Sequence, residues 1–186
     1  TGINDAPVAV DDTDAVNEDA TVTRTSGDNL LMADDSDADD DDAFTVTQIA
    51  VTGGSNNAVT ASSTYNSGSP ETVTGTYGTL TVGADGTYTY VADQSAADDL
   101  DASDTATDSF TYTISDGDTT DTATLIFTVT GVNDVPEAAD KTVTTNEDTA
   151  YVFSASDFGY TDADDDDALV SVKITTLEDA GALQYN

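Results

Sequence analysis

The chain lacks both cysteine and histidine, and its only basic residues are Arg24, Lys141 and Lys173. These absences exclude thiolate and imidazole metal sites, as well as Cys or Ser nucleophiles activated by His. They also exclude stabilisation by disulfides, without defining the redox compartment. No apolar run has transmembrane length, and no signal peptide opens the sequence. Any metal ion must therefore be bound by oxygen atoms.

Positive charge is nearly absent, since 38 acidic residues leave a formal net charge of −35. Electrostatic repulsion then excludes nucleic acid and anionic membrane surfaces as partners. Almost all the acids are aspartate, whose short side chain suits turns and tight oxygen cages. This bias indicates acidic loops rather than charged helix surfaces.

One passage is present twice, as GINDAPVAVDDTDAVNEDA at 2–20 and GVNDVPEAADKTVTTNEDT at 131–149, at an offset of 129 residues. Each copy leads into an aspartate run, SDADDDDA at 36–43 and TDADDDDA at 161–168. We predict a tandem array: a complete module over 1–130, then a linker and an incomplete second module over 131–186. Neighbouring modules and export signals are expected outside this sequence.

Alternation of apolar and polar residues predicts an all-β fold. The dipeptides Asp85-Gly86 and Asp116-Gly117 each predict a hairpin turn. Seven strands, as in an immunoglobulin-like sandwich, are expected at Pro7–Val10, Thr21–Thr25, Phe44–Val51, Tyr77–Val82, Thr87–Val91, Phe110–Ile114 and Leu125–Val129. We interpret 52–72 as a surface loop and expect a short helical turn near Ser95–Leu100.

Strand direction predicts which acidic loops meet. In an up-and-down sandwich the loops at 17–19 and 98–104 lie at the same end of the module. The last strand also ends there, followed by Asn133 and Asp134. The run at 162–167 is expected at the adjoining end of the next module. All four groups are therefore predicted to converge on one junction.

The junction motif GVNDVP resembles the Asp-x-Asn-Asp-x-x-Pro linker of cadherins, and LDASD at 100–104 is similar to their Leu-Asp-Arg-Glu element. The runs DADDDD resemble their Asp-x-Asp loop. The sequence of nearly all of residues 1–150, including NEDA, NEDT and YGTLTVGADGTYTY, closely resembles VCBS and cadherin-like repeats of giant bacterial (RTX-type) adhesins. This resemblance implies a secreted, cell-surface module stiffened by calcium, with Glu18, Asp101, Asp104, Asp134, Asp162 and Asp164 as ligands. Asp104 stands where such repeats usually have Glu.

Calcium takes six to eight oxygen ligands in irregular geometry, which suits several acidic loops meeting at one place. The EF-hand pattern and the glycine-rich nonapeptide repeat are both absent. We expect several Ca²⁺ ions, in a junction cluster and in a further site at the opposite end of the first module. The candidate ligands are Asn17, Glu18, Asp101, Asp104, Asn133, Asp134, Asp162, Asp164 and Asp166 at the junction, and Asn4, Asp5, Asp37, Asp39, Asp41 and Asp116 at the other end.

Several acids and aromatics have less specific interpretations. Asp11, Asp12, Asp14, Asp28 and Asp121 are assigned to a solvated surface, and Tyr88, Tyr90, Phe110 and Tyr112 to the core. Paired carboxylates can perform glycosidase chemistry, but open charged loops do not raise the pKa of an acid as that chemistry requires, so no enzyme is expected. An isopeptide bond from Lys141 or Lys173 would rest on residue types alone.

Two function classes stay open at this stage. The module is a calcium-dependent spacer of a surface adhesin that supports biofilm formation, or it binds polysaccharide or another adhesin fragment itself. Buried aromatics would favour the spacer, and a row of exposed aromatics would favour binding. The apolar residues of 150–186 are expected to be covered by a complementary fragment, by a second copy or by packing back on the first module, because three or four strands cannot close a sandwich.

Overall fold

The computed structural model describes residues 3–25, 30–39, 43–164 and 168–176. The chain divides into two compact units, Thr1–Asn133 and Asp134–Asn186. The sequence places this boundary at 130/131, within three residues of the division in the structure. Among the described residues, no helix is both long and apolar enough to cross a membrane.

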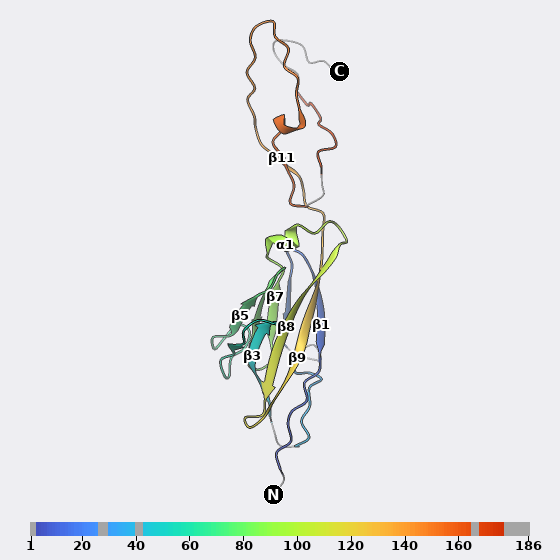
Figure 1. Ribbon diagram of the computed structural model, residues 1–186. Coiled ribbons are helices and arrows are strands. Elements are labelled where there is room, and N and C mark those ends of the chain that lie inside the picture. The colour runs from blue at the N-terminus through green and yellow to red at the C-terminus, as the bar shows by residue number, and fades with distance from the viewer. Residues whose placement is uncertain (1–2, 26–29, 40–42, 165–167, 177–186) are drawn as a thin grey trace. The chain divides into compact units, whose positions relative to one another are not determined.

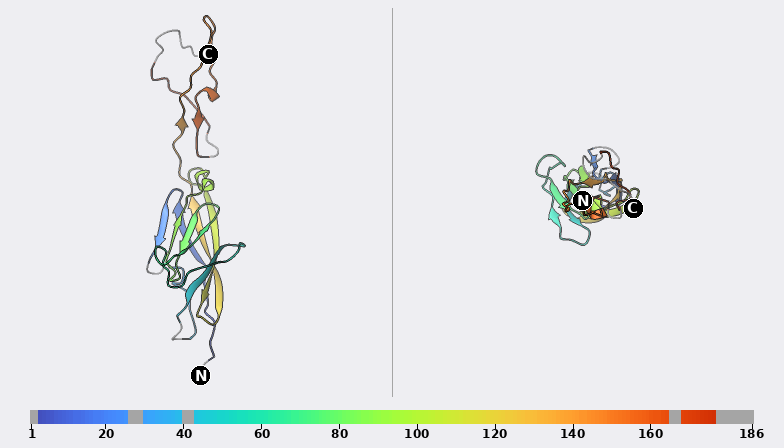
Figure 2. Two further views of the ribbon diagram at one scale, coloured as in Figure 1. Left: turned by 90° about the vertical axis from the view of Figure 1, so that its left-hand side faces the viewer. Right: turned by 90° about the horizontal axis from the view of Figure 1, so that it is seen from above.

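The first unit is a β-sandwich, which confirms the predicted fold class (Figures 1 and 2). One sheet has the order β1 (Asp12–Asn17), β9 (Thr120–Thr130), β8 (Thr105–Ser115), β3 (Thr45–Val51) and β4 (Asn57–Ala58). The other has the order β2 (Thr21–Arg24), β7 (Tyr88–Val91), β6 (Thr79–Val82) and β5 (Glu71–Thr74). β1 runs parallel to β9, and the remaining pairs are antiparallel.

The core between the sheets is built from alternate residues of each strand, as the period-2 pattern requires. Tyr90 and Phe127 stack with ring centroids 4.0 Å apart, and Tyr88 and Phe110 pack edge-on against Phe127. The core assignment of the four aromatics is confirmed, since Tyr88 is 3% exposed and Tyr90, Phe110 and Tyr112 are fully buried. The first unit therefore buries the rings that could otherwise have stacked on a sugar.

Both predicted hairpin turns are present. Gly86 and Gly117 have φ of 79° and 106°, a conformation that glycine adopts without steric cost. The expected helical turn is α1 (Ser95–Asp98), with Ala97 buried beneath it.

The predicted first strand is wrong. Pro7–Val10 makes only an isolated bridge, between Val8 and Ser36, and the strand is β1 instead. Its sequence, DTDAVN, has the composition of a loop. It forms a strand because it pairs with β9 and because its inward side chains make polar contacts within the sandwich.

The interpretation of 52–72 as an unpacked loop is also wrong. It contains β4 and the start of β5, and the side chains of Val59 and Ser63 are buried. Ser63 accepts a hydrogen bond from the Ala84 amide at 3.0 Å, so the segment is packed against the β6–β7 turn. The count of nine strands in the described first unit, rather than seven, follows from β4 and β5.

A buried carboxylate shapes the turn between β5 and β6. Asp108 of β8 is 4% exposed and accepts hydrogen bonds from the amides of Thr76, Tyr77 and Gly78 at 2.8–3.0 Å. It also accepts one from the Tyr90 hydroxyl at 2.7 Å. The turn therefore occupies the first two positions of the strand predicted at 77–82.

The second unit has little regular structure. β10 (Glu137–Ala138) pairs with β11 (Tyr160–Thr161), and a 3-10 helix, η1 (Ala155–Asp157), begins with a capping box formed by Ser154 and Asp157. Most of its described large apolar side chains are exposed, including Val152, Phe153, Val170, Val172 and Ile174.

Candidate metal centre

Glu18 lies on the turn that joins β1 to β2. Asp19 has φ of 57°, and the Ala20 amide closes the turn on the Asn17 carbonyl at 3.2 Å. The Glu18 amide donates to the Thr130 carbonyl at 3.0 Å, and Glu18 Oε1 accepts the Val132 amide at 2.6 Å. The side chain is 5% exposed, so this carboxylate is fixed against the last residues of the first unit.

The loop after α1 contacts the same last residues. The Asp104 amide closes a turn on the Asp101 carbonyl at 2.8 Å, and the Gly131 amide donates to the Asp104 carbonyl at 2.9 Å. A Cβ at Gly131 would overlap the carbonyl oxygens of Leu100 and Asp101, so only glycine permits this approach. The structure thus brings the turns of Glu18, Asp101 and Asp104 to one short segment, 130–132.

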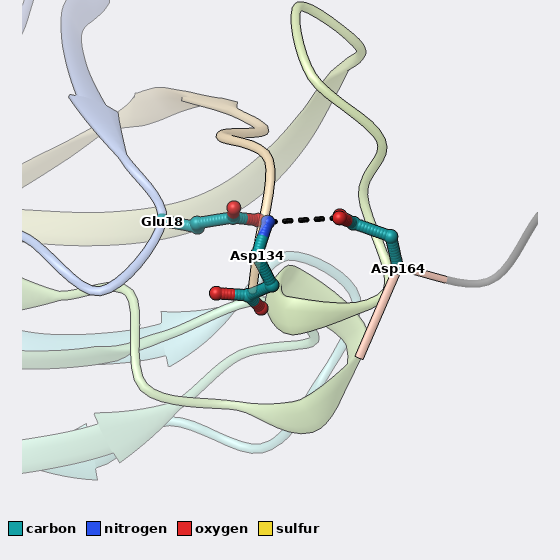
Figure 3. A group of neighbouring side chains, drawn as sticks. All are labelled: Glu18, Asp134 and Asp164. Carbon is teal, nitrogen blue, oxygen red and sulfur yellow. Dashed lines mark hydrogen bonds between the residues drawn. The ribbon is translucent and has the colours of Figure 1, made fainter. Parts of the chain in front are cut away.

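The Asp134 amide in the second unit donates to Asp164 Oδ2 at 2.8 Å (Figure 3, where Glu18 is also drawn). Asp164 is 4% exposed, and its other oxygen, Oδ1, is buried with no hydrogen-bond partner within the described residues. Asp162 presents the same arrangement: Oδ2 accepts the Tyr160 hydroxyl at 2.8 Å, while Oδ1 is buried and unpartnered in the described chain.

The first unit contains the same contact, which we call the linker clasp. In the linker clasp, the backbone amide of the linker Asp donates a hydrogen bond to the side chain of the second aspartate of Asp-Ala-Asp. Here the Asp5 amide donates to Asp39 Oδ2 at 2.7 Å. The Asp39 amide donates to Asp37 Oδ1 at 3.0 Å, and Asp37 Oδ2 is buried without a partner among the residues described. The Val8–Ser36 bridge beside it corresponds to the β10–β11 pair of the second unit.

The first linker clasp meets the β8–β9 turn. Asn4 Nδ2 donates to Asp116 Oδ2 at 3.0 Å, and Asp116 accepts the amides of Asp118 and Thr119 through Oδ1, both at 2.7 Å. The hydrogen bonds from the Thr119 amide and from Asn4 hold the pKa of Asp116 below its usual range. Asp116 therefore stays ionised as a potential ligand beside Asn4 and Asp5.

The remaining predicted ligands are less closely placed. Asn17 contributes its carbonyl to the Glu18 turn, and Asn133 follows directly after the segment bound by Glu18. Asp41 and Asp166 lie outside the described residues.

The donor chemistry of both clasps suits a hard cation. Three buried carboxylate oxygens, on Asp37, Asp162 and Asp164, have no donor within the described residues to offset their desolvation. Carboxylate and carbonyl oxygens are the ligands that calcium takes, and the side chains here supply no nitrogen or sulfur ligand. The residues present therefore fit Ca²⁺.

The assignment of Asp12 and Asp14 to a solvated surface is wrong, whereas Asp11 is exposed, as assigned. Asp14 binds Arg24 through two hydrogen bonds, of 2.7 and 2.9 Å, and accepts the Tyr88 hydroxyl at 2.8 Å. Asp12 contacts the Tyr112 hydroxyl at 2.9 Å. Asp11 and Asp121 bind backbone amides, of Thr124 and Ala9 respectively. Asp28 lies outside the described residues.

A signal for two of these contacts was present in the sequence. Asp12, Asp14 and Val16 alternate with exposed residues, so they share the inward face of β1. Recognising it required knowing that 12–17 is a strand.

In the comparison with protein families, the model of the bacterial cadherin-like domain fits residues 4–131. The chain belongs to this family. A search of curated proteins found no match. The cadherin-like sandwich is typical of extracellular structural and adhesive modules and is not typically an enzyme.

Proposed function

We propose that the chain is a calcium-binding spacer of a large bacterial surface adhesin, in which calcium stiffens the junctions between modules. The observation that carries this proposal is the linker clasp, present in both units with the same donor and acceptor. Asp134 is 129 residues after Asp5, and Asp164 is 125 residues after Asp39, so the clasp is retained across a four-residue difference in spacing.

Chain continuity supports the assignment of Glu18 to the junction ion. Glu18 holds the Val132 amide from the first unit, and Asp164 holds the Asp134 amide from the second. These two amides are only two residues apart in the chain. We therefore propose that Glu18, Asp101, Asp104, Asn133, Asp134, Asp162 and Asp164 bind the junction calcium, and that the first clasp serves a preceding module in the same way.

Burial of the aromatics of the first unit supports a spacer rather than a sugar-binding module for that unit. Among the described residues of the first unit, the large exposed apolar side chains are Ile3, Val8, Val10 and Val132, and none of them is aromatic. A polysaccharide platform built on rings would need such residues on a sheet face.

Calcium titration of the whole chain tests the proposal. Adding Ca²⁺ at about 100 times its Kd stabilises by about 2.7 kcal/mol, which raises Tm by on the order of 10 °C over the value in EGTA. Magnesium at the same concentration is expected to raise Tm less, because it retains its water. An equal Tm in EGTA and in excess calcium would contradict a structural role for calcium.

Paired variants locate the ions. Asp39→Asn and Asp164→Asn each keep the size of the side chain while removing one carboxylate, and each is expected to weaken calcium binding at least tenfold at its own clasp. Asp140→Asn, an exposed position that belongs to neither predicted ligand cluster, is the matched control. Isothermal titration measures the number of ions and their affinity, and unchanged stoichiometry and affinity in both variants would place the ions elsewhere.

A second candidate function, association with another adhesin fragment, is favoured by the exposed apolar residues of the second unit. In the first unit, the strands on either side of the Asp-Ala-Asp motif are covered by partner strands. β2 pairs with β7, and β3 pairs with β8. Sedimentation should detect self-association of the chain at micromolar concentrations, and Val172→Asp with Ile174→Asp should abolish it. A chain that is monomeric throughout this range would count against homophilic association.

A further inference from the structure

The Tyr112 hydroxyl, on β8 of the first unit, is surrounded by three oxygen atoms. It lies 2.8 Å from the Val10 carbonyl, 2.9 Å from Asp12 Oδ2 and 3.4 Å from Asp35 Oδ1. The ring is fully buried, and burial raises the pKa of Tyr112, so the phenol keeps its proton. None of the functions described above uses this group.

The number of protons at this site does not match the number of acceptors. A phenol has one hydrogen to donate, while a backbone carbonyl and an ionised carboxylate can only accept. Two short contacts, to Val10 and to Asp12, therefore share one hydrogen unless one partner brings a second. Only a carboxyl group can bring it. With the hydrogen on Asp12, the acid donates to Tyr112 and Tyr112 donates to Val10, so that both short contacts become good hydrogen bonds.

The neighbouring carboxylates indicate why the proton lies on Asp12. Asp35 Oδ1 accepts the Val10 amide at 2.8 Å, Asp121 Oδ2 accepts the Ala9 amide at 2.9 Å, and Asp11 Oδ1 accepts the Thr124 amide at 2.8 Å. The Ala9 amide lowers the pKa of Asp121. Burial raises the pKa of Asp35, although the Val10 amide opposes this. Asp35 lies 3.4 Å from the Tyr112 hydroxyl and Asp12 only 2.9 Å, so the shorter contact assigns the proton to Asp12. Asp12 instead faces a hydroxyl group that can accept a hydrogen as readily as donate one.

The surroundings also disfavour a charge on Asp12. Asp12 is partly buried, and the groups that face it are Asp11 on its own strand, Asp34 and Asp35 on the loop before the first clasp, and Tyr112 on β8. No cation is among these neighbours. Burial, with the charges of Asp34, Asp35 and Asp11, raises the pKa of Asp12 to about 7, although the hydrogen bond with Tyr112 lowers it.

We propose that Asp12 is a neutral carboxylic acid in the folded module, and that the chain of hydrogen bonds Asp12–Tyr112–Val10 is a proton-dependent latch that fastens the entering segment 8–12 to the sandwich. Val10 is held through both its carbonyl and its amide, by Tyr112 and Asp35. Loss of the Asp12 proton removes one donor and leaves a charge in an acidic, partly buried site. The latch is therefore closed in mildly acidic surroundings and weakened in alkaline ones.

The direction of the pH effect follows from linkage. Because the folded form binds the proton more tightly than the unfolded chain, the contribution of Asp12 is fully present below about pH 4. It is lost progressively as pH rises to about 7, and it changes little above that value.

Carbon-13 NMR of the Asp12 carboxyl carbon in the labelled whole chain tests the latch directly. The Asp12→Asn variant assigns the signal, which is expected to titrate at least two pH units above an ordinary aspartate. Titration near pH 4 would overturn the proposal, whatever the variants do.

Two variants test the consequence for stability. Asp12→Asn supplies a permanent donor, so its Tm relative to wild type should be higher by about 5 °C or more at pH 8 than at pH 5. Tyr112→Phe removes the hydroxyl that links Asp12 to Val10, so it should lower Tm more at pH 5 than at pH 8. Both are compared in EGTA and in saturating calcium, with the exposed Asp140→Asn as control. Equal differences at the two pH values would make Asp12 an ordinary hydrogen-bond acceptor and exclude the latch.

Discussion

The two units share the same local motifs but differ in what surrounds them. Asp19 and Asp148 have φ of 57° and 58°, and the amides of Ala20 and Thr149 each close the turn at 3.2 Å. Yet Glu18 is 5% exposed, whereas Glu147 at the equivalent position is exposed. The turn is therefore determined by the local sequence, and the environment of its carboxylate is determined by distant strands.

The same contrast holds for the strands. In the first unit, sheet partners that are far apart in the sequence cover the apolar side chains, while the described second unit retains the clasp and one short strand pair without such a core. Turns and clasps require few residues close in sequence, whereas a sheet requires partners from elsewhere. This difference predicts which substitutions affect one unit and not the other.

Substitution of Asp108 should have the largest effect. Asp108→Ala leaves three amides and the Tyr90 hydroxyl without their acceptor in a buried place, which should cost about 4 kcal/mol of the free energy of unfolding of the first unit. Urea unfolding followed by tyrosine fluorescence measures this loss. The amide signal of Asp134, in the second unit, should be unchanged, and a loss below about 1 kcal/mol would show that water replaces the carboxylate.

Hydrogen exchange should show the equivalence of the two clasps. If both bind calcium, the amides of Asp5 and Asp134 should exchange more than tenfold more slowly in calcium than in EGTA. The amide of Ser109 in the centre of the first sheet is the internal reference. Protection at only one of the clasp amides would break the comparison between the units.

Removal of the Arg24–Asp14 pair should have a smaller effect. Arg24 Nη2 lies 2.7 Å from Asp14 Oδ1, and the Arg24 side chain is 32% exposed, so Arg24→Met should cost about 1 kcal/mol. Burial opposes the charge on Asp14, but hydrogen bonds from Arg24, Ala15 and Tyr88 outweigh it and lower the pKa of Asp14. This stabilisation is therefore present above about pH 4 and is lost as pH falls below that value.

Thermal unfolding at pH 7 and pH 3 measures the effect. The Tm difference between wild type and Arg24→Met should shrink at pH 3, and a constant difference would assign the loss to packing of the Arg24 stem.

The smallest effect is expected at Lys141, which forms an ion pair in the second unit. Lys141 Nζ lies 2.8 Å from Asp157 Oδ1, but the lysine side chain is 43% exposed and screened by solvent. Lys141→Met should change Tm by less than about 1 °C. A larger loss would mean that this pair organises the η1 region more than the contrast between the units suggests.

The parts of the fold that depend on local signals could be predicted from the sequence. The Gly86 and Gly117 turns and the alternating strands β8 and β9 need only neighbouring residues. β1 could not be predicted, because its aspartates resemble a loop until Tyr88 and Tyr112 supply donors from the core. β5 was missed because the turn after it depends on Asp108, some 30 residues away.

The same distinction applies to the candidate site. The recurrence of Asn-Asp and of Asp-Ala-Asp, at offsets of 129 and 125 residues, indicated the clasp residues as candidate ligands, because their contacts follow the repeated motif. The roles of Asp12 and Asp35 could not be predicted, since they depend on the hydroxyl of one buried tyrosine on another strand.

The parallel pairing of β1 with β9 has a mechanical consequence. These are the first and last strands of the first unit, in register from Asp12 beside Leu125 to Asn17 beside Thr130. The polypeptide therefore enters at one end of the pair and leaves at the other. Tension applied to the two ends of the unit slides one strand along its neighbour, so that the hydrogen bonds between them carry the load together instead of breaking one after another. In this geometry, resistance to stretching comes from the strand order itself, before any ion is bound.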